Sequence, residues 1–322
     1  MIIDQKKIKI WSTIGSRATF GMALLEISKD MKDLIVLSSD VSTSAGLDRF
    51  RKLQPEKYVE LGISEQNMIG VATGLSAENF NVVTTTFAPF QTIRCCEQIK
   101  INLGYMKHKV TLVGLASGLA LGNLGYTHCC IEDIGILRTI PNITILSPAD
   151  CLETVKCLQH SLKSKGSVYI RLTGTANNPI VYSEDYNFEI GKAIKLREGN
   201  DITIFSTGRM VHNSLKAAEI LSEKKISARV INIHTIKPID KKVIEDANNT
   251  KMIFSVEEHN IIGGLGSAIA EHQSSLKNSV KFIRLGLQDA YSNGGSYEYL
   301  QKKHGLSSEN IVETILKNYQ NK

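Results

Sequence analysis

The sequence predicts an α/β protein made of two three-layer α/β domains, each with a mainly parallel sheet between helices. Two observations support this prediction. Short apolar runs of strand length alternate with segments of helical periodicity along the chain. This alternation breaks once, at residues 174–190, in a polar stretch with Asn, Pro and Ser. We therefore expect a first domain over residues 1–180 and a second over residues 190–322.

The elements of the first domain follow from the apolar spacing. A helix is expected where Phe20, Ala23, Leu24 and Ile27 share one face. Continuous apolar runs that end in polar residues are typical of buried parallel strands. Strands are expected at 33–40, 58–63, 81–87, 108–115, 143–150 and 167–174, with helices at 17–31, 65–75, 90–105, 130–140 and from Asp150, which is expected to cap its helix.

The second domain shows the same alternation, beginning after the polar stretch. Strands are expected at 201–208, 227–238, 251–259 and 280–287, with a helix at 210–224 and a helical tail from Gln301. In parallel sheets, ligands gather where strands end at their carboxyl edge. The residues at or just past such strand ends are Asp40, Glu65, Phe87, Ala116 and Arg171.

Composition excludes several classes of protein. The chain has 322 residues, 42% hydrophobic and 22% charged, and the net charge of +6 comes from interspersed Lys, Arg, Asp and Glu. This pattern does not favour a nucleic-acid surface. The most apolar window, 110–124, is shorter than the roughly 20 residues of a membrane span. Six cysteines without a C-x-x-C pair or zinc spacing, and no signal-peptide pattern at the N-terminus, indicate a cytoplasmic protein with free thiols and no metal ligands of its own.

Glu65 lies where an apolar run meets a helical pattern, and two interpretations of it are open. An acid in the first turn of a helix is favoured by the helix dipole, and Ser64 is able to cap the same helix. A carboxyl group between apolar segments at the ligand edge of a sheet is instead a candidate for a functional site.

Three longer segments resemble one family. "GISEQNMIGVATGLS" (62–76) is similar to the segment with the catalytic glutamate of transketolases and deoxyxylulose-phosphate synthases, which use thiamine diphosphate. "TTFAPFQTIRCCEQIKINLGYMKHKVTLVG" (85–114) resembles their aromatic stretch, and "GNLGYTHCCIEDIGILRTIPNITILSPAD" (122–150) resembles their G-x-x-G-P-T-H loop. The resemblance to the transketolase superfamily extends over residues 10–315. It implies the pyrimidine-binding domain followed by the transketolase C-terminal domain.

The resemblance implies roles for residues around the cofactor. Glu65 would hydrogen-bond the pyrimidine N1′ nitrogen and so control the proton of the reactive thiazolium carbon. Phe87 and Phe90 would pack on the flat pyrimidine ring. Asp40 would be the family's acidic residue near the cofactor and the dimer interface.

The resemblance also implies substrate contacts. His128, in "GYTHCC", would contact the ketose oxygens, and Arg17, Ser44 and Arg171 would hold the sugar phosphate. Two positions depart from the family pattern. Leu124 stands where transketolases have an acid that binds a substrate hydroxyl, and Ala116 stands where a second histidine is expected. These departures predict an unusual sugar substrate.

The diphosphate half of the family's cofactor site has no counterpart in the sequence, which contains no G-D-G motif. We therefore expect the C-terminal subunit of a split transketolase. A separate N-terminal subunit would hold the diphosphate and Mg²⁺ or Ca²⁺, in an α2β2 heterotetramer. Three alternatives stay open: an enzyme like deoxyxylulose-phosphate synthase, a β-type subunit of a 2-oxo-acid dehydrogenase, and a non-catalytic subunit.

Overall fold

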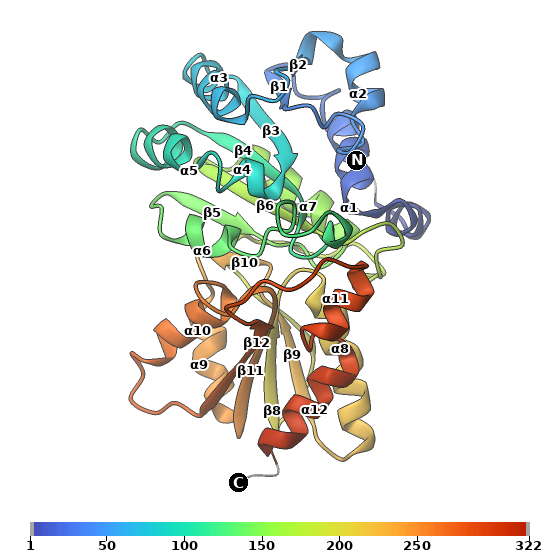
Figure 1. Ribbon diagram of the computed structural model, residues 1–322, viewed down its shortest axis with the longest axis vertical. Helices are drawn as coiled ribbons and strands as arrows, with labels where there is room; N and C mark the ends of the chain where they lie inside the picture. The colour runs from blue at the N-terminus through green and yellow to red at the C-terminus, as the bar shows by residue number, and fades with distance from the viewer. Residues whose placement is uncertain (1–2, 320–322) are drawn as a thin grey trace.

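Two sheets, each covered by helices on both faces, lie one above the other in the computed structural model, which describes residues 3–319 (Figure 1). This arrangement confirms the predicted fold class. Residues 1–2 and 320–322, the outer ends of the two expected domains, lie outside the described residues.

The first sheet has seven strands in the order β10-β5-β6-β4-β3-β1-β2. Every neighbouring pair is parallel except β10 with β5, which is antiparallel. The strands are β1 (Leu34–Ser38), β2 (Tyr58–Glu60), β3 (Asn81–Phe87), β4 (Val110–Ser117), β5 (Ile143–Leu146), β6 (Ser167–Thr173) and β10 (Thr235–Lys237). Because β10 comes from the second half of the chain, the break at residues 174–190 does not separate the two sheets completely.

Helices cover both faces of the first sheet. One apolar cluster joins α1 and α7 to the sheet, and a second joins α3, the π-helical segment η2 and α6 to its other face. The second cluster continues into the second sheet through Phe205, Ile231 and Ile253, so the two domains share a core. The helices are α1 (Gln5–Ile27), α2 (Asp48–Leu53), α3 (Glu65–Ala77), α4 (Ala88–Gln91), α5 (Cys96–Gln98), η2 (Ile99–Tyr105), α6 (Asp133–Arg138) and α7 (Cys151–Lys163), with short 3-10 turns η1 (Pro55–Lys57) and η3 (Gly122–Leu124).

The second sheet has five strands in the order β12-β11-β8-β9-β7, parallel except for β7 with β9. Helices α8 and α12 pack on one face, and α9 and α10 on the other. The elements are β7 (Ile194–Arg197), β8 (Ile202–Ser206), α8 (Met210–Glu223), β9 (Ala228–Asn232), α9 (Lys241–Asp246), η4 (Ala247–Asn249), β11 (Met252–Asn260), α10 (Leu265–Gln273), β12 (Lys281–Leu287), α11 (Tyr297–Lys303) and α12 (Ser308–Tyr319).

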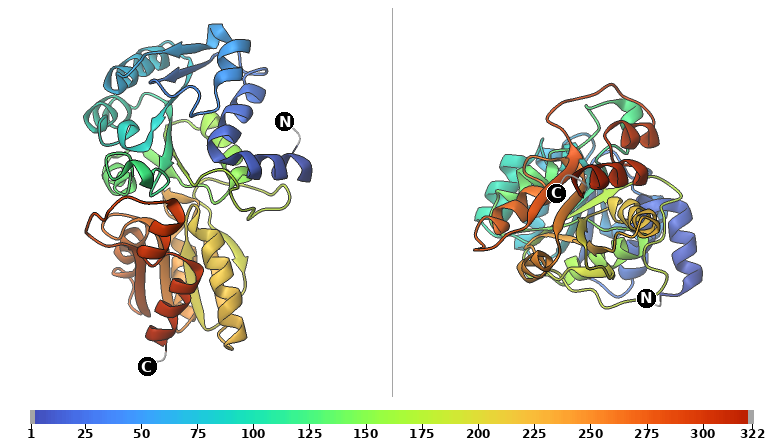
Figure 2. Two further views of the ribbon diagram at one scale, coloured as in Figure 1. Left: turned by 45° about the vertical axis from the view of Figure 1, so that its right-hand side comes forward. Right: turned by 90° about the horizontal axis from the view of Figure 1, so that it is seen from below.

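Three expected elements differ in the structure. Helix α1 begins at Gln5, not at residue 17, and bends at Gly15, whose φ of 84° lies in the left-handed region. Figure 2 shows the part before this bend running out from the body of the domain. The helix expected over 90–105 is broken into α4, α5 and η2. Strand β2 is an exposed edge strand, not a buried one, because it pairs only with β1.

The polar stretch after β6 packs against the first domain. Phe188 is buried, and Asp150 Oδ2 accepts hydrogen bonds from the backbone N–H groups of Val181 and Tyr182. Asp150 Oδ1 accepts from Glu153 N at 2.9 Å, which confirms the predicted cap of α7.

All six cysteines are free thiols, and five of them are buried. None of the helices formed by residues 3–319 has the length and apolar character needed to cross a membrane.

Candidate active site

The carboxyl ends of four parallel strands meet at one edge of the first sheet. Phe87 is the last residue of β3, and Asp40 follows β1. The loop that leaves β4 carries His128, and the turn after β2 leads into α3 at Glu65. The fold thus places most of the predicted residues along this edge.

Glu65 is the first residue of α3 and is buried, with 5% of its surface exposed. Ser64 stands at the N-cap position, but its hydroxyl donates to the Leu61 carbonyl oxygen at 2.7 Å and does not cap the helix. Glu65 Oε1 accepts a hydrogen bond from Arg94 Nη1 at 2.6 Å. The carboxylate therefore lies between the positive end of a helix and a guanidinium group.

Phe87, Phe90 and His128 form one cluster of rings. The Phe90 centroid lies 5.5 Å from that of His128 and 6.4 Å from that of Phe87, and Phe87 and His128 are also 6.4 Å apart. All three pairs meet edge to face, at interplanar angles of 68–77°. The loop histidine and the two phenylalanines thus come together although 38 positions separate Phe90 from His128.

Arg94 connects the ring cluster to Glu65, and sequence reasoning missed it. Its guanidinium carbon lies 4.0 Å from the centroid of the Phe90 ring, in a cation–π contact, while Nη1 binds Glu65. The Arg94 side chain is 42% exposed, so it has room to move away from Glu65. The signal in the sequence was the i, i+4 spacing of Phe90 and Arg94.

A second group lies where the loop after β1 meets α1. Asp40 is exposed, with a φ of 56°, and its backbone N–H donates to Glu60 Oε1 at 2.8 Å. Arg17 is half-buried, and burial lowers the pKa of its guanidinium. Within residues 3–319 no hydrogen bond or ion pair involves the Arg17 side chain. Ser44 is also half-buried, and its loop approaches α1 so closely that a Cβ on Gly46 would lie 3.2 Å from the Arg17 carbonyl oxygen.

Arg171 does not belong to either group, and the expected phosphate contact of this residue is wrong. Only 1% of its surface is exposed, and Nε donates to both carboxylate oxygens of Asp133, at 3.0 and 2.8 Å. Nη2 donates to the carbonyl oxygens of Cys130 and Glu258. Burial alone would lower the pKa of Arg171, but the Asp133 charge outweighs burial and raises it. A phosphate would have to displace Asp133 from the protein interior, which is why Arg171 is a structural cation.

The two departures from the family pattern lie in different environments. Leu124 is 57% exposed in η3, within the loop that carries His128. Ala116 is buried at the end of β4, with a φ of 52°. Only position 124 therefore presents a side chain to solvent.

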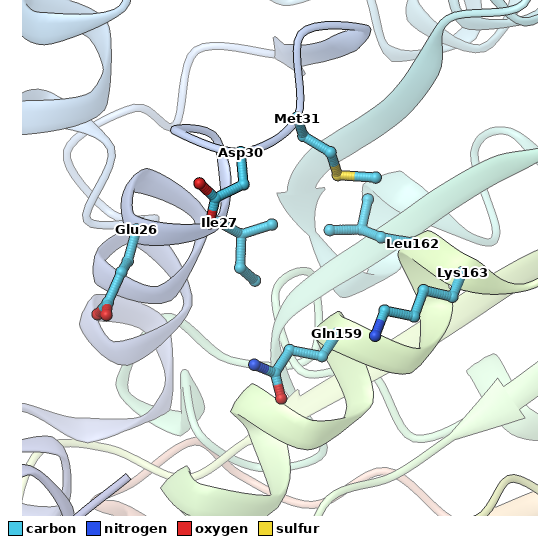
Figure 3. A pocket seen from close by; sticks show the side chains of 7 residues that line it. All are labelled: Glu26, Ile27, Asp30, Met31, Gln159, Leu162 and Lys163. Carbon is cyan, nitrogen blue, oxygen red and sulfur yellow. The ribbon is translucent and has the colours of Figure 1, made fainter. Parts of the chain in front are cut away.

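The cavity in Figure 3, of about 330 Å³, lies between the end of α1 and α7. Glu26 and Ile27 line one side, and Gln159, Leu162 and Lys163 line the other. None of the predicted site residues lines it, so it is separate from the candidate active site.

Comparisons with known proteins agree with this geometry. Residues 12–178 match the family "Transketolase, pyrimidine binding domain", and residues 191–311 match "Transketolase, C-terminal domain". One of the named subunits of the apulose-4-phosphate transketolase of Phocaeicola vulgatus is 36% identical, over 94% of this chain and 97% of its own length. The 6-deoxy-6-sulfo-D-fructose transketolase subunit SqwH of a Clostridium species is also 36% identical, over 92% of both chains. A solved structure described as a split gene transketolase, inactive beta4 tetramer, superimposes with a TM-score of 0.87 at 34% identity, covering 94% of this chain and 98% of that one.

The fold and the cluster at the sheet edge define a pyrimidine-binding domain joined to a transketolase C-terminal domain. The chain belongs to the transketolase family, whose members use thiamine diphosphate with a divalent metal.

Proposed function

We propose that this chain is the C-terminal subunit of a split transketolase that transfers a two-carbon ketol unit from a ketose phosphate to an aldose. A separate N-terminal subunit holds the cofactor's diphosphate and Mg²⁺ or Ca²⁺, and the two form an α2β2 heterotetramer. The observation that carries the proposal is the meeting of Glu65 with the Phe87, Phe90 and His128 rings at one sheet edge.

The contacts of Arg94 test whether these residues fit the pyrimidine half of the cofactor. Its guanidinium group is flat, lies on the Phe90 ring and donates an N–H to Glu65. A pyrimidine ring stacked on Phe90 with a nitrogen facing Glu65 needs the same two partners, so the residues fit. When bound, thiamine diphosphate supplies the carbon nucleophile for the ketose carbonyl. Glu65 shares a proton with the ring nitrogen N1′, and the phenylalanines orient the ring and exclude water.

The substrate lies on the other side of the same edge. His128 donates to the ketose oxygens, which places the carbon–carbon bond to be broken next to the cofactor. Arg17 and Ser44 hold the phosphate group, because Arg17 is a half-buried cation with no ion-pair partner among residues 3–319. Asp40 lies beside them on the β1–α2 loop and borders the cofactor.

The relatives support the separate partner. The P. vulgatus and Clostridium proteins are named as subunits, and this chain matches nearly their whole length. Apolar side chains are exposed on both sides of the Glu65–Arg94 pair, with Ile63 at 77% and Ile93 at 44%. Such side chains suit a surface that a partner covers. The free thiols support a cytoplasmic location.

The sugars that the enzyme uses differ from those of common transketolases, in this proposal, because of Leu124. An exposed apolar side chain at this position cannot accept a hydrogen bond from a substrate hydroxyl. The relatives are named for apulose 4-phosphate and for 6-deoxy-6-sulfo-D-fructose, so similar subunits act on different sugars. A deoxy or modified ketose is therefore the first donor to test.

The first experiment titrates thiamine diphosphate and Mg²⁺ into this chain alone and into this chain with a candidate N-terminal subunit, monitored by near-ultraviolet circular dichroism. Binding only in the mixture supports the split enzyme. Tight binding to this chain alone contradicts it. Association of the two chains without cofactor binding would identify a non-catalytic subunit.

The second experiment compares Glu65→Gln with Glu78→Gln in the assembled enzyme. Glu78 is an exposed acid at the other end of α3, so its variant is the matched control. Glu65→Gln is expected to lower turnover by about two orders of magnitude or more without changing assembly. Equal turnover in the two variants would contradict the catalytic role of Glu65. Ketose phosphates and pyruvate, offered as donors in parallel, separate the transketolase from an enzyme like deoxyxylulose-phosphate synthase.

A further inference from the structure

The loop that carries His128 is closed at its base by a pair of backbone hydrogen bonds. Gly118 N donates to the Cys130 carbonyl oxygen at 2.7 Å, and Cys130 N donates to the Gly118 carbonyl oxygen at 3.0 Å. His128 lies only two residues before this closure. The position of the loop base therefore determines where the imidazole ring lies against Phe90.

A carboxylate from the other domain reaches this base. Glu258, near the end of β11, is 2% exposed, and its Oε1 accepts a hydrogen bond from Leu119 N at 2.7 Å. Its Oε2 accepts from Tyr297 Oη at 2.5 Å and from Gln301 Nε2 at 3.3 Å, both on α11. Burial raises the pKa of Glu258, and the site of His128 uses neither of its oxygens.

The glycine beside this carboxylate shows how closely the two fit. Gly118 has a φ of 69°, and a Cβ at this position would lie 2.2 Å from Glu258 Oε1. A side chain there would push the carboxylate away from Leu119 N. The loop base and Glu258 are thus shaped for each other.

The backbone of Glu258 is held at the same place. Arg171 Nη2 donates to the carbonyl oxygen of Glu258 at 2.9 Å and to that of Cys130 at 3.2 Å. One guanidinium group thereby joins β6, β11 and the loop base. Further along the loop, Gly295 N donates to the Gly122 carbonyl oxygen at 3.0 Å. The loop is therefore supported mainly by residues of the second domain.

We propose that Glu258 is a positioning residue for His128, so that the C-terminal domain, which contributes no residue to the proposed cofactor site, sets the geometry of substrate binding. The proposal rests on the role given to His128 in the proposed function. Glu258 acts through the loop: it satisfies the buried Leu119 N–H and ties the loop base to α11.

The test uses Glu258→Leu, which removes both acceptor oxygens, and Glu258→Gln, which keeps one. Hydrogen exchange of the unassembled chain is measured first, because it does not depend on activity. Loss of a hydrogen bond to a charged group is expected to speed exchange over residues 118–130 by about tenfold in Glu258→Leu. Glu258→Gln is expected to restore most of the protection.

Glu257→Leu is the matched control, because Glu257 is the neighbouring buried acid on β11 and also accepts from two backbone N–H groups. Those groups belong to Leu265 and Gly266 in α10, away from the loop. Its variant is expected to speed exchange in α10 and not at 118–130. If both variants expose the loop equally, or neither does, the positioning role of Glu258 is wrong. Where Glu258→Leu fails to fold, Tyr297→Phe removes one donor to Glu258 and is expected to produce a smaller change at the same segment.

Kinetics of the assembled enzyme distinguish this proposal from the proposed function. Glu258→Leu and His128→Ala are both expected to raise KM for the donor sugar about tenfold or more, with the affinity for thiamine diphosphate unchanged. If His128→Ala leaves KM unchanged, the role of His128 fails. If His128→Ala raises KM and Glu258→Leu, with its loop exposed, does not, the role of Glu258 in positioning fails.

Discussion

Replacing Arg171 by methionine is expected to destabilise the fold, not to weaken the binding of a sugar phosphate. Arg171 and Asp133 are both buried, and the guanidinium donates to both carboxylate oxygens. The variant leaves the Asp133 carboxylate without its cation, and the carbonyl oxygens of Cys130 and Glu258 without a donor. Breaking one side of a buried ion pair costs about 3–5 kcal/mol. A typical protein has about 5–15 kcal/mol of stability, so this loss is large.

Urea unfolding followed by circular dichroism measures the loss. Arg171→Met is expected to unfold at a clearly lower urea concentration than the wild type. The double variant Arg171→Met/Asp133→Asn is expected to recover part of the loss, because the uncompensated charge is gone. Arg17→Met is the control. Its guanidinium is half-buried and has no ion-pair partner among residues 3–319, so its stability is expected to stay within about 0.5 kcal/mol of the wild type.

The refuting result is specific. If Arg171→Met unfolds with the wild-type midpoint and raises KM for a phosphorylated donor, Arg171 is a phosphate ligand and its ion pair with Asp133 contributes little. A lower midpoint with unchanged KM in the remaining folded enzyme supports the structural role.

Three further predictions concern other charged side chains. Arg94→Met removes the group that competes with the cofactor for Glu65 and Phe90. An exposed ion pair is worth up to about 1 kcal/mol and a cation–π contact about 0.5–1 kcal/mol, so calorimetry should show roughly tenfold tighter binding of thiamine diphosphate to the assembled enzyme; weaker binding would show that Arg94 assists the cofactor. Arg17→Ala is expected to raise KM about tenfold or more for a phosphorylated donor and much less for its unphosphorylated form, and equal effects on both would exclude a phosphate contact. Burial raises the pKa of Glu257 from its ordinary 4.5 to about 7, so its contribution to stability is complete below pH 4.5 and is lost as the pH rises through 7. Glu257→Gln stays neutral and should gain stability relative to the wild type between about pH 5 and about pH 8 in urea unfolding, whereas a constant difference would contradict this titration.

The strand ends explain why much of the site was predictable. Phe87 and His128 follow adjacent parallel strands, β3 and β4, so the alternation of strands and helices already implied a common edge. Glu65 follows β2, on the same edge. Residues whose placement depends only on strand order and direction are predictable in this way.

Side-chain contacts across the chain were not predictable. Arg171 looked like a cation at the same edge, but Asp133 of α6 holds it inside the protein. Arg94 looked like an exposed helical arginine, but the helix expected over 90–105 breaks, and its guanidinium reaches both Phe90 and Glu65. Neither pairing follows from the spacing of residues along one element.

By itself, the sequence determined the α/β class, most strands, the capped start of α7 and the family, because hydrophobic period and turn chemistry are local properties. Only the tertiary structure decided that β10 joins the first sheet, that α1 begins at Gln5 and bends at Gly15, and that Glu258 supports the loop of His128. Each of these depends on partners distant in the sequence. Their free energy is set by burial and by hydrogen bonds that form only once both domains have packed together.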